Sequence, residues 1–481
     1  MTQKENIPQG RLAFVILTAV LLGLVGIIMI TGDGAVQFHP VVVLSFAVNI
    51  GIFFWQLLRS VWAHPFSFDM MTWLFCLFFF GYAPLLQHMT DTYAWKLDPT
   101  IGEVIGANGI VLLWTVCYLL GRDYRRYPRL KGLADKLTGK LRPLADRIPR
   151  WKGMKFRLGK KTVLNLLLLL AICCAGVDIL TVGLIEQLSR ATAEAGTGNT
   201  AVDLIMTHGI NNILLFVAAI YVIEAKKAKK IGWKTLIALL CLGIACFPTG
   251  LSRNMMASFY AGMLILMLDA SRRGRWFSWV IFGGLIFIFP AMEVFRWLLV
   301  LDRGDPIQLI LNSFQSSYLD GHFDAHQMII SIGRYVEEYG FAWGKQILGA
   351  LLFFVPRSIW PGKPEGTGHT AIVALDQFHF SNVSAPMPAE GYVNFGLVGV
   401  ICIGILLGIV ARRMDSAYWR SRKGKYPEKS VDFLYPFAMF MFFFFLRGDM
   451  MSAWAYTFAQ TLVGWALFTV WHLAADPEDD K

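Results

Sequence analysis

Charged residues are scarce in this chain of 481 residues: Asp, Glu, Lys and Arg make up 16% of it, whereas hydrophobic residues make up 56%. This composition excludes a soluble globular fold. Apolar stretches near the ~20 residues that are needed to cross a bilayer recur along the chain. The sequence therefore predicts an all-α polytopic membrane protein.

Cysteine motifs are absent as well. The seven cysteines all lie in predicted membrane spans, so we expect no disulfide framework in the segments outside the membrane. No CxxC or HExxH pattern occurs, and we expect neither a catalytic metal nor a cofactor. The two halves of the chain show no internal repeat. No cleavable signal peptide is expected, because the first apolar stretch is as long as a full span.

About twelve transmembrane helices are predicted, nine in residues 1–299 and three in residues 391–481, with a large extracytoplasmic loop at 300–390 between them. The predicted spans are 12–30, 41–58, 69–87, 103–120, 162–182, 205–224, 235–248, 255–270, 277–298, 391–411, 432–446 and 452–472. A basic amphipathic segment at 121–161 is predicted to lie on the cytoplasmic membrane surface.

The basic residues predict the orientation of these spans. Lys and Arg are retained on the cytoplasmic side of short loops, and 34 of the 44 fall on one side of the predicted membrane. Both termini are then cytoplasmic, and the loop 300–390 faces outward. The net charge of +11 is no sign of nucleic-acid binding, because most of the excess lies where topology and anionic lipid headgroups account for it. The ten outward cations are not explained in this way, and a bound anion would explain them.

The loop 300–390 is organised in two parts. Residues 310–358 are predicted to form two or three helices of mixed polarity, broken at Asp320-Gly321 and near Gly340. The following stretch to Pro388 is rich in Pro, Gly and Ser and has no apolar period, which favours an ordered loop over a cavity. Charged side chains beside apolar spans are costly unless they face water or a ligand, so we expect the functional site here.

Four motifs support a family resemblance: PRSIWPGKP at 356–364, EGYVNFG at 390–396, DGHFDAHQ at 320–327 and FLRGDM at 445–450. Over roughly residues 245–455 the chain resembles Wzy-type polymerases of lipid-linked oligosaccharide repeat units. The resemblance implies a metal-independent glycosyltransferase of GT-C-like, multi-span architecture at the periplasmic face of the bacterial inner membrane. It implies undecaprenyl-diphosphate-linked oligosaccharides as donor and acceptor, O-antigen or exopolysaccharide as product, and a Wzz-type chain-length co-polymerase as partner.

The reaction implied by this resemblance needs three kinds of residue. A diphosphate leaving group gains charge in the transition state, so fixed cations stabilise it, and Arg is preferred for its forked donors. An acceptor hydroxyl needs a base. The diphosphate-binding candidates are Arg253, Arg303, Arg357, Lys363 and Arg447; the candidate bases are Glu390, His369 and Asp449; the sugar-binding candidates are Asn394, His322 and His326.

Simpler explanations stay open for several of these residues. Arg253 could anchor a helix end in the headgroups, and Glu390 could be only an N-terminal acid that the helix macrodipole favours. Arg447 and Asp449 could form a local ion pair across a tight turn. The two histidines of HFDAH at 322–326 could suit a metal on a helix.

Two other functions also stay open. O-antigen ligase uses the same donor and leaving group but transfers the glycan to lipid A core sugars. A flippase or secondary transporter would also need many spans and cations for a polyanionic headgroup. The clustering of candidates on one side of the membrane favours an enzyme over a transporter.

Overall fold

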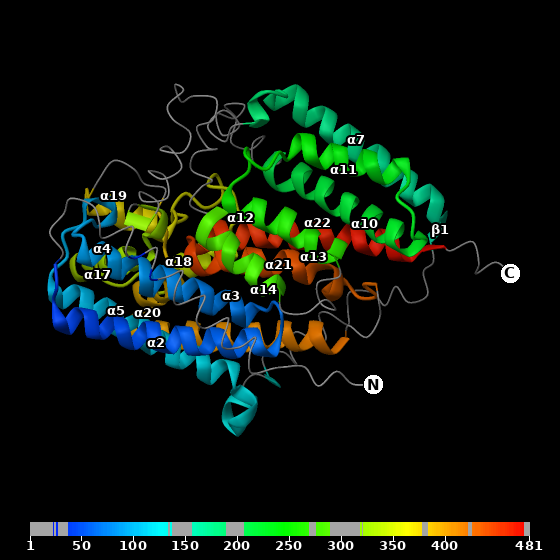
Figure 1. Ribbon diagram of the computed structural model, residues 1–481. Helices are drawn as coiled ribbons and strands as arrows, with labels where there is room; N and C mark the ends of the chain where they lie inside the picture. The colour runs from blue at the N-terminus through cyan, green and yellow to red at the C-terminus, as the bar shows by residue number, and fades with distance from the viewer. Residues whose placement is uncertain are drawn as a thin grey trace, which may run out of the picture.

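The computed structural model describes residues 37–132, 135–136, 156–188, 206–268, 276–288, 318–319, 321–377, 383–421 and 426–475, together with Gly23 and Gly26. Its long helices run side by side along one axis (Figure 1). The helices are α2 (Pro40–Ala63), α3 (Phe68–Phe75), α4 (Ala83–Met89), α5 (Ile101–Arg122), α7 (Lys160–Val182), α10 (Asn211–Ala228), α11 (Trp233–Ala245), α12 (Arg253–Met256), α13 (Gly262–Leu268), α14 (Trp276–Gly283), α17 (Ala325–Tyr339), α18 (Lys345–Leu351), α19 (Thr367–Ala374), α20 (Met387–Ser421), α21 (Ser430–Arg447) and α22 (Met450–Leu473). Short π-helical stretches at Cys76–Tyr82, Met206–Ile210, Ala257–Ala261 and Gly284–Ile288 adjoin these helices, and β1 (Phe156–Gly159) pairs in parallel with β2 (Ala474–Ala475).

Seven of the described helices are long and apolar enough to cross a membrane. They are Pro40–Ala63, Phe68–Met89, Ile101–Arg122, Lys160–Val182, His208–Ala228, Met387–Arg420 and Ser430–Arg447. The prediction of an all-α polytopic membrane protein is therefore confirmed. Shorter apolar helices at Trp233–Ala245, Arg253–Leu268 and Phe277–Ile288 fall where the seventh to ninth spans are predicted.

The number of twelve spans stays a prediction. The first predicted span, 12–30, lies outside the described residues apart from two glycines, and about half of the basic segment 121–161 lies outside them too. Helix α22 falls on the twelfth predicted span but is not among the seven.

The prediction for the loop 300–390 is partly wrong. Helix α17 ends before Gly340, whose φ is +80°, so the break near this glycine is as expected. The stretch up to Pro388, however, contains helix α19 and the start of α20. The buried residues of α19 are Thr367, Gly368, Ala371 and Ile372, and three of the four are small. The helix therefore shows no helical repeat of large apolar residues by which it could be predicted.

Two hydrophobic cores hold the helices together. One joins α2, α3, α5, α17 and α20 with α21, and the other joins α7, α10, α11 and α22 with the same α21. In Figure 1, α7 and α11 lie on the upper side, α2 and α5 on the lower side, and α21 and α22 between them. Helix α21 therefore links both parts of the bundle.

Helix α20 is bent sharply at Phe395-Gly396. The φ of Gly396 is +60°, and a Cβ on Gly399 would lie only 2.0 Å from the carbonyl oxygen of Gly391. In a straight helix, eight residues would separate these two glycines by about 12 Å. The motif EGYVNFG therefore forms a separate short helix that folds back on the long part of α20, rather than opening a continuous span.

Small residues allow α20 to approach α5 closely. A Cβ on Gly408 would lie 2.2 Å from the carbonyl oxygen of Tyr118, and one on Gly404 would lie 2.9 Å from that of Trp114. Gly404 and Gly408 form a GxxxG pattern, which brings helix backbones together in membranes. The close contact depends on the absence of side chains at these positions.

Gly408→Ala is expected to lower the unfolding midpoint of the protein in detergent, because the new methyl group has to push α5 and α20 apart, at a cost of about 1–3 kcal/mol. Gly109→Ala on α5 is the matched control, since its Cβ would meet nothing within 4 Å. Equal midpoints for both variants would mean that the α5–α20 contact contributes little to stability.

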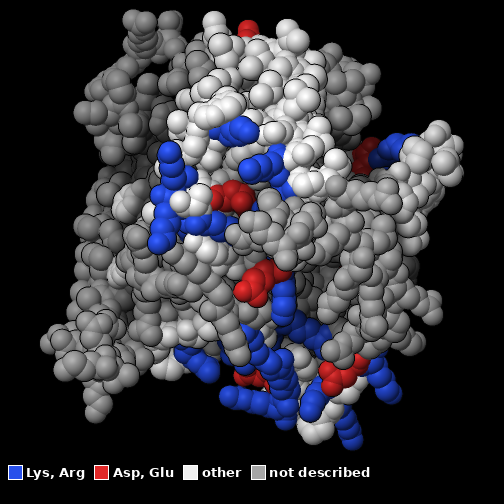
Figure 2. All heavy atoms as spheres, turned by 90° about the vertical axis from the view of Figure 1, so that its right-hand side faces the viewer, with Lys and Arg blue, Asp and Glu red and all other residues white. Residues whose placement is uncertain are grey.

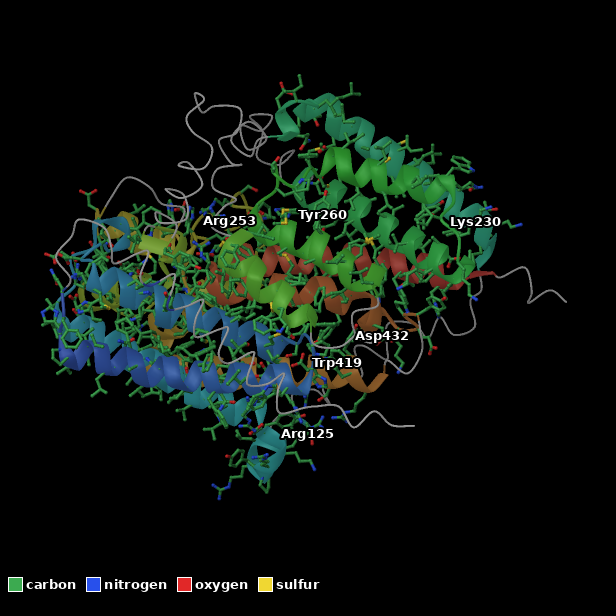
Figure 3. The ribbon with its side chains drawn as sticks, viewed as in Figure 1. Arg125, Lys230, Arg253, Tyr260, Trp419 and Asp432 are labelled. Carbon is green, nitrogen blue, oxygen red and sulfur yellow. The ribbon has the colours of Figure 1, made fainter. Side chains whose placement is uncertain are left out.

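Lys and Arg gather at one end of the bundle, which Figure 2 shows face on. The end of α5, the start of α7 and the turn between α10 and α11 lie at this end of the bundle. Figure 3 labels Lys230 at this end and Arg253 toward the other. Helix α21 starts near the basic end and reaches Arg447 seventeen residues later, so Arg447 lies about 25 Å away along the axis.

Candidate functional site

Two acids predicted as bases, Glu390 and Asp449, meet where α19, the start of α20 and the turn between α21 and α22 converge. Glu390 is only 1% exposed. One of its oxygens accepts a hydrogen bond from the backbone N–H of Met450 (2.9 Å), and the other accepts one from the hydroxyl of Thr367 (2.8 Å). The first turn of α20 thus holds this acid against both neighbouring segments.

Asp449 lies beside Glu390 and caps α22. One carboxylate oxygen accepts from the backbone N–H of Met451 (2.8 Å). The other lies against Gly366, where a Cβ would come within 2.1 Å of it. Burial raises the pKa of Asp449, although backbone N–H groups of its own cap and of the start of α19 oppose the rise. The pair therefore forms a buried acidic centre.

Asn394 lies one turn after Glu390, as its spacing predicts. It is fully buried, and its Nδ2 donates to the backbone carbonyl of Glu390 (2.8 Å). Its Oδ1 has no hydrogen-bond partner within the described part of the chain. Asn394 thus supports the acidic centre, and whether it contacts a sugar stays a prediction.

Arg447 does not pair with Asp449 across the turn. Its Nη2 instead contacts Asp324 (3.2 Å), which is fully buried and also accepts from Trp95 Nε1 (3.0 Å) and the backbone N–H of Ser384 (3.1 Å). The local ion pair considered from the sequence is therefore replaced by one to a residue more than a hundred positions away.

The guanidinium of Arg447 is held on several sides. It donates to the carbonyl of Gly321 (3.4 Å) and lies over the ring of Phe79, 5.9 Å from its centroid. Its Nε has no hydrogen-bond partner among the residues that the structure describes. Both hydrogen bonds of this cation come from Nη2, so Nη1 too makes no hydrogen bond to the described residues.

Arg253 lies beside His322, with 3.2 Å between Nη2 and Nε2. A guanidinium can only donate, so in this contact His322 accepts through Nε2. His322 follows Gly321, whose carbonyl binds Arg447, so the motif DGHFDAHQ brings two predicted cations together. Arg303, another predicted diphosphate ligand, lies outside the described residues.

His326 lies apart from these residues, and its binding to a sugar stays a prediction. It is 2% exposed and lies between α17 and α5, where its Nε2 is 3.2 Å from Asn108 Oδ1. Burial lowers its pKa to about 3. The histidines of HFDAH therefore have different partners and do not converge on one ligand. Among the described residues, no group of three or more His, Cys, Asp or Glu is placed to hold a metal ion.

Three predicted residues lie together on the outer side of the segment that leads into α19. Arg357 is 3.6 Å from Glu365, which also contacts His369, and it donates to the carbonyl of Lys363 (2.8 Å). Lys363 donates to the backbone carbonyls of Phe353 and Val355, just after α18, and burial together with the nearby Arg357 lowers its pKa. The buried side of the same segment provides Thr367, so one segment joins this surface group to the acidic centre.

Three residues of the site escaped prediction. Asp324 holds Arg447 in place, Trp95 holds Asp324, and Thr367 holds Glu390. Asp324 lies inside the motif DGHFDAHQ, and this was the only sequence signal for it. The other two are single polar groups whose partners lie far away in the chain.

Comparison of the chain with protein-family models, with curated proteins and with solved structures finds no match in any of the three. The arguments about function therefore rest on the motifs and on the geometry described above.

Proposed function

We propose that this protein polymerises undecaprenyl-diphosphate-linked oligosaccharide repeat units at the periplasmic face of a bacterial inner membrane. One observation carries the proposal: a buried acid pair, Glu390 and Asp449, and a fixed cation, Arg447, meet at a single turn at one end of a membrane bundle. Glycan transfer from a lipid diphosphate needs an acid–base group and a cation in this proximity. The likeness of four motifs to Wzy-type polymerases supports the same function.

In the proposed reaction, a hydroxyl at the non-reducing end of the acceptor attacks the anomeric carbon of the donor glycan. The new glycosidic bond forms while the bond between that carbon and the diphosphate oxygen breaks, and the hydroxyl proton passes to the acid pair. Undecaprenyl diphosphate leaves with the bonding electrons. Arg447 and Arg253 stabilise its charge through hydrogen bonds to phosphate oxygens. His369, on the outer side of α19, is the alternative proton acceptor.

The finer architecture belongs to the same proposal. It comprises twelve spans in a GT-C-like arrangement, both termini in the cytoplasm, and a Wzz-type co-polymerase as partner. The concentration of Lys and Arg at the end away from Arg447 supports this orientation, because basic residues stay on the cytoplasmic side (Figure 2).

The proposal is tested by reconstituting the purified protein in liposomes with an undecaprenyl-diphosphate-linked repeat unit and following glycan length by gel and mass spectrometry. A ladder of lengths with released undecaprenyl diphosphate is the expected result. Donor consumption only after addition of lipid A core would show a ligase instead. Movement of the lipid across the bilayer without consumption would show a transporter.

Gly366→Ala is expected to slow chain extension at least tenfold, because the new Cβ would lie 2.1 Å from the Asp449 carboxylate and displace it. The backbone at this cap position is extended, with φ −59° and ψ 146°, and alanine adopts these angles readily, so the effect comes from the methyl group. Gly333→Ala on α17 is the control, since its Cβ would meet nothing within 4 Å. If the two variants extend chains equally fast, the position of Asp449 does not matter for the reaction.

Arg357→Ala is expected to abolish chains longer than one repeat while the unfolding midpoint stays unchanged. The side chain of Arg357 is 54% exposed, and an exposed ion pair such as that with Glu365 contributes under about 1 kcal/mol. Arg420→Ala at the basic end removes the same charge and is expected to have no effect on chain length. If the Arg357→Ala variant makes chains of wild-type length, Arg357 takes no part in the reaction.

A further inference from the structure

A second charged surface lies at the end of the bundle opposite Arg447, where α10 ends and α11 begins. Five lysines fall within nine residues of each other there, and two more begin α7. They are Lys226, Lys227, Lys229, Lys230 and Lys234, with Lys160 and Lys161 on α7. In Figure 2, the upper of two groups of Lys and Arg lies over this part of the molecule and surrounds acidic atoms.

A single acid, Glu224, pairs with two of these lysines. Its Oε1 is 3.5 Å from Lys160 Nζ and 3.4 Å from Lys227 Nζ, and it accepts a hydrogen bond from the indole of Trp471 (3.1 Å). Lys227 Nζ also lies 4.6 Å from the centroid of the Trp471 ring. One carboxylate is therefore shared by two ammonium groups.

Four other lysines, Lys161, Lys229, Lys230 and Lys234, pair with no acid among the described residues. Lys234 donates to the neutral Asn165 of α7 (2.7 Å), which ties α11 to α7. Lys161, Lys229 and Lys230 are exposed, and no acidic side chain within the described ranges pairs with them. Figure 3 shows Lys230 pointing away from the bundle. The surface therefore attracts anions.

An exposed apolar face begins directly beside these cations. Trp233, Leu236 and Leu240 follow one another at helical spacing on α11, and each is more than half exposed. Leu166 and Leu169 of the neighbouring α7 are likewise more than half exposed. A row of cations above an apolar face, with a Trp at the boundary, fits a lipid whose headgroup is anionic and whose acyl chains lie along the helices.

We propose that the start of α7 and the α10–α11 turn form a binding site for an anionic phospholipid. Lys161, Lys230 and Lys234 contact its phosphate groups, and its acyl chains lie along the outer faces of α7 and α11. Helix α11 has 13 residues, about 20 Å, and is shorter than the ~30 Å apolar layer. A headgroup bound at its start fixes that end of the short helix at the membrane surface. The site lies away from the acidic centre and is independent of the proposed reaction.

The site is tested by native mass spectrometry of the purified full-length protein in detergent, with equal amounts of cardiolipin and phosphatidylethanolamine added. Wild-type protein is expected to retain cardiolipin selectively. Lys161→Gln/Lys230→Gln is expected to weaken its retention by roughly tenfold or more, because each lysine near a headgroup contributes to the attraction. Neither side chain makes a described contact that holds the fold, so the unfolding midpoint in lipid-free detergent should not change.

The matched control is Arg126→Gln/Arg129→Gln, which removes two exposed charges beyond the end of α5 at the same end of the bundle. It is expected to retain cardiolipin as the wild type does. Equal losses in the two double variants would show only general attraction to the basic end and would overturn the site. Equal retention of phosphatidylethanolamine would overturn the preference for an anionic headgroup.

Discussion

Glu390→Gln is expected to slow chain extension by about 10²–10⁴-fold while the protein stays folded. Glutamine has the shape of glutamate and can keep both hydrogen bonds: its oxygen accepts from the backbone N–H of Met450, and its Nε2 donates to Thr367 after the hydroxyl rotates. What the variant loses is the ability to take a proton. The measurement is the initial rate of extension in liposomes, with the unfolding midpoint recorded in parallel.

The control for this variant is Glu428→Gln, an exposed acid just before α21 at the basic end, which should extend chains at the wild-type rate. A folded Glu390→Gln protein with an unchanged rate would transfer the role of proton acceptor to Asp449 or His369. A large fall in the unfolding midpoint would instead identify Glu390 as a structural acid that holds the three segments together.

Asp324→Ala is expected to destabilise the protein by about 3–5 kcal/mol, because it leaves Arg447 without its buried partner. The same change deprives the indole of Trp95 and the backbone N–H of Ser384 of their acceptor. A marked fall in the unfolding midpoint in detergent is the expected observation. Adding Arg447→Met should recover part of the loss, since the unpaired cation is then removed as well.

Asp135→Ala provides the comparison for this effect. Asp135 also pairs with an arginine, Arg413, at 3.5 Å, but its side chain is 61% exposed. An exposed pair contributes under about 1 kcal/mol, so the midpoint should hardly move. Similar midpoints for Asp324→Ala and Asp135→Ala would mean that Arg447 is not held by Asp324 in the membrane.

The apolar spans could be predicted because they depend on local composition. Helices α2, α5, α7 and α21 fall on predicted spans, and their ends differ from the predicted ones by five residues at most. Prediction was weaker where a helix is short. Helix α19 buries mainly small residues on one face, and the sharp bend of α20 depends on one glycine with positive φ. Neither feature changes the apolar pattern that marks a span.

The candidate residues were partly predictable and their partners were not. Glu390, Asp449 and Arg447 belong to motifs that are visible in the sequence, but the nearest charge to Arg447 in the chain, Asp449, is not its partner. Arg447 binds Asp324 because α17 and the end of α21 pack against the same π-helical stretch after α3. A contact between residues so far apart in the chain depends on how the helices pack. The spacing of residues within a motif does not predict it.

By itself the sequence determined that this is a helical membrane protein, which end of it collects lysine and arginine, and which polar residues do not belong in a membrane. These properties follow from the solvation of each segment, which is a local quantity. Only the tertiary structure decided that Glu390 and Asp449 form one buried pair, that Arg447 is anchored by Asp324, and that His326 lies in the core. Pairing and burial depend on the packing of distant segments, so they appear only once the helices are placed together.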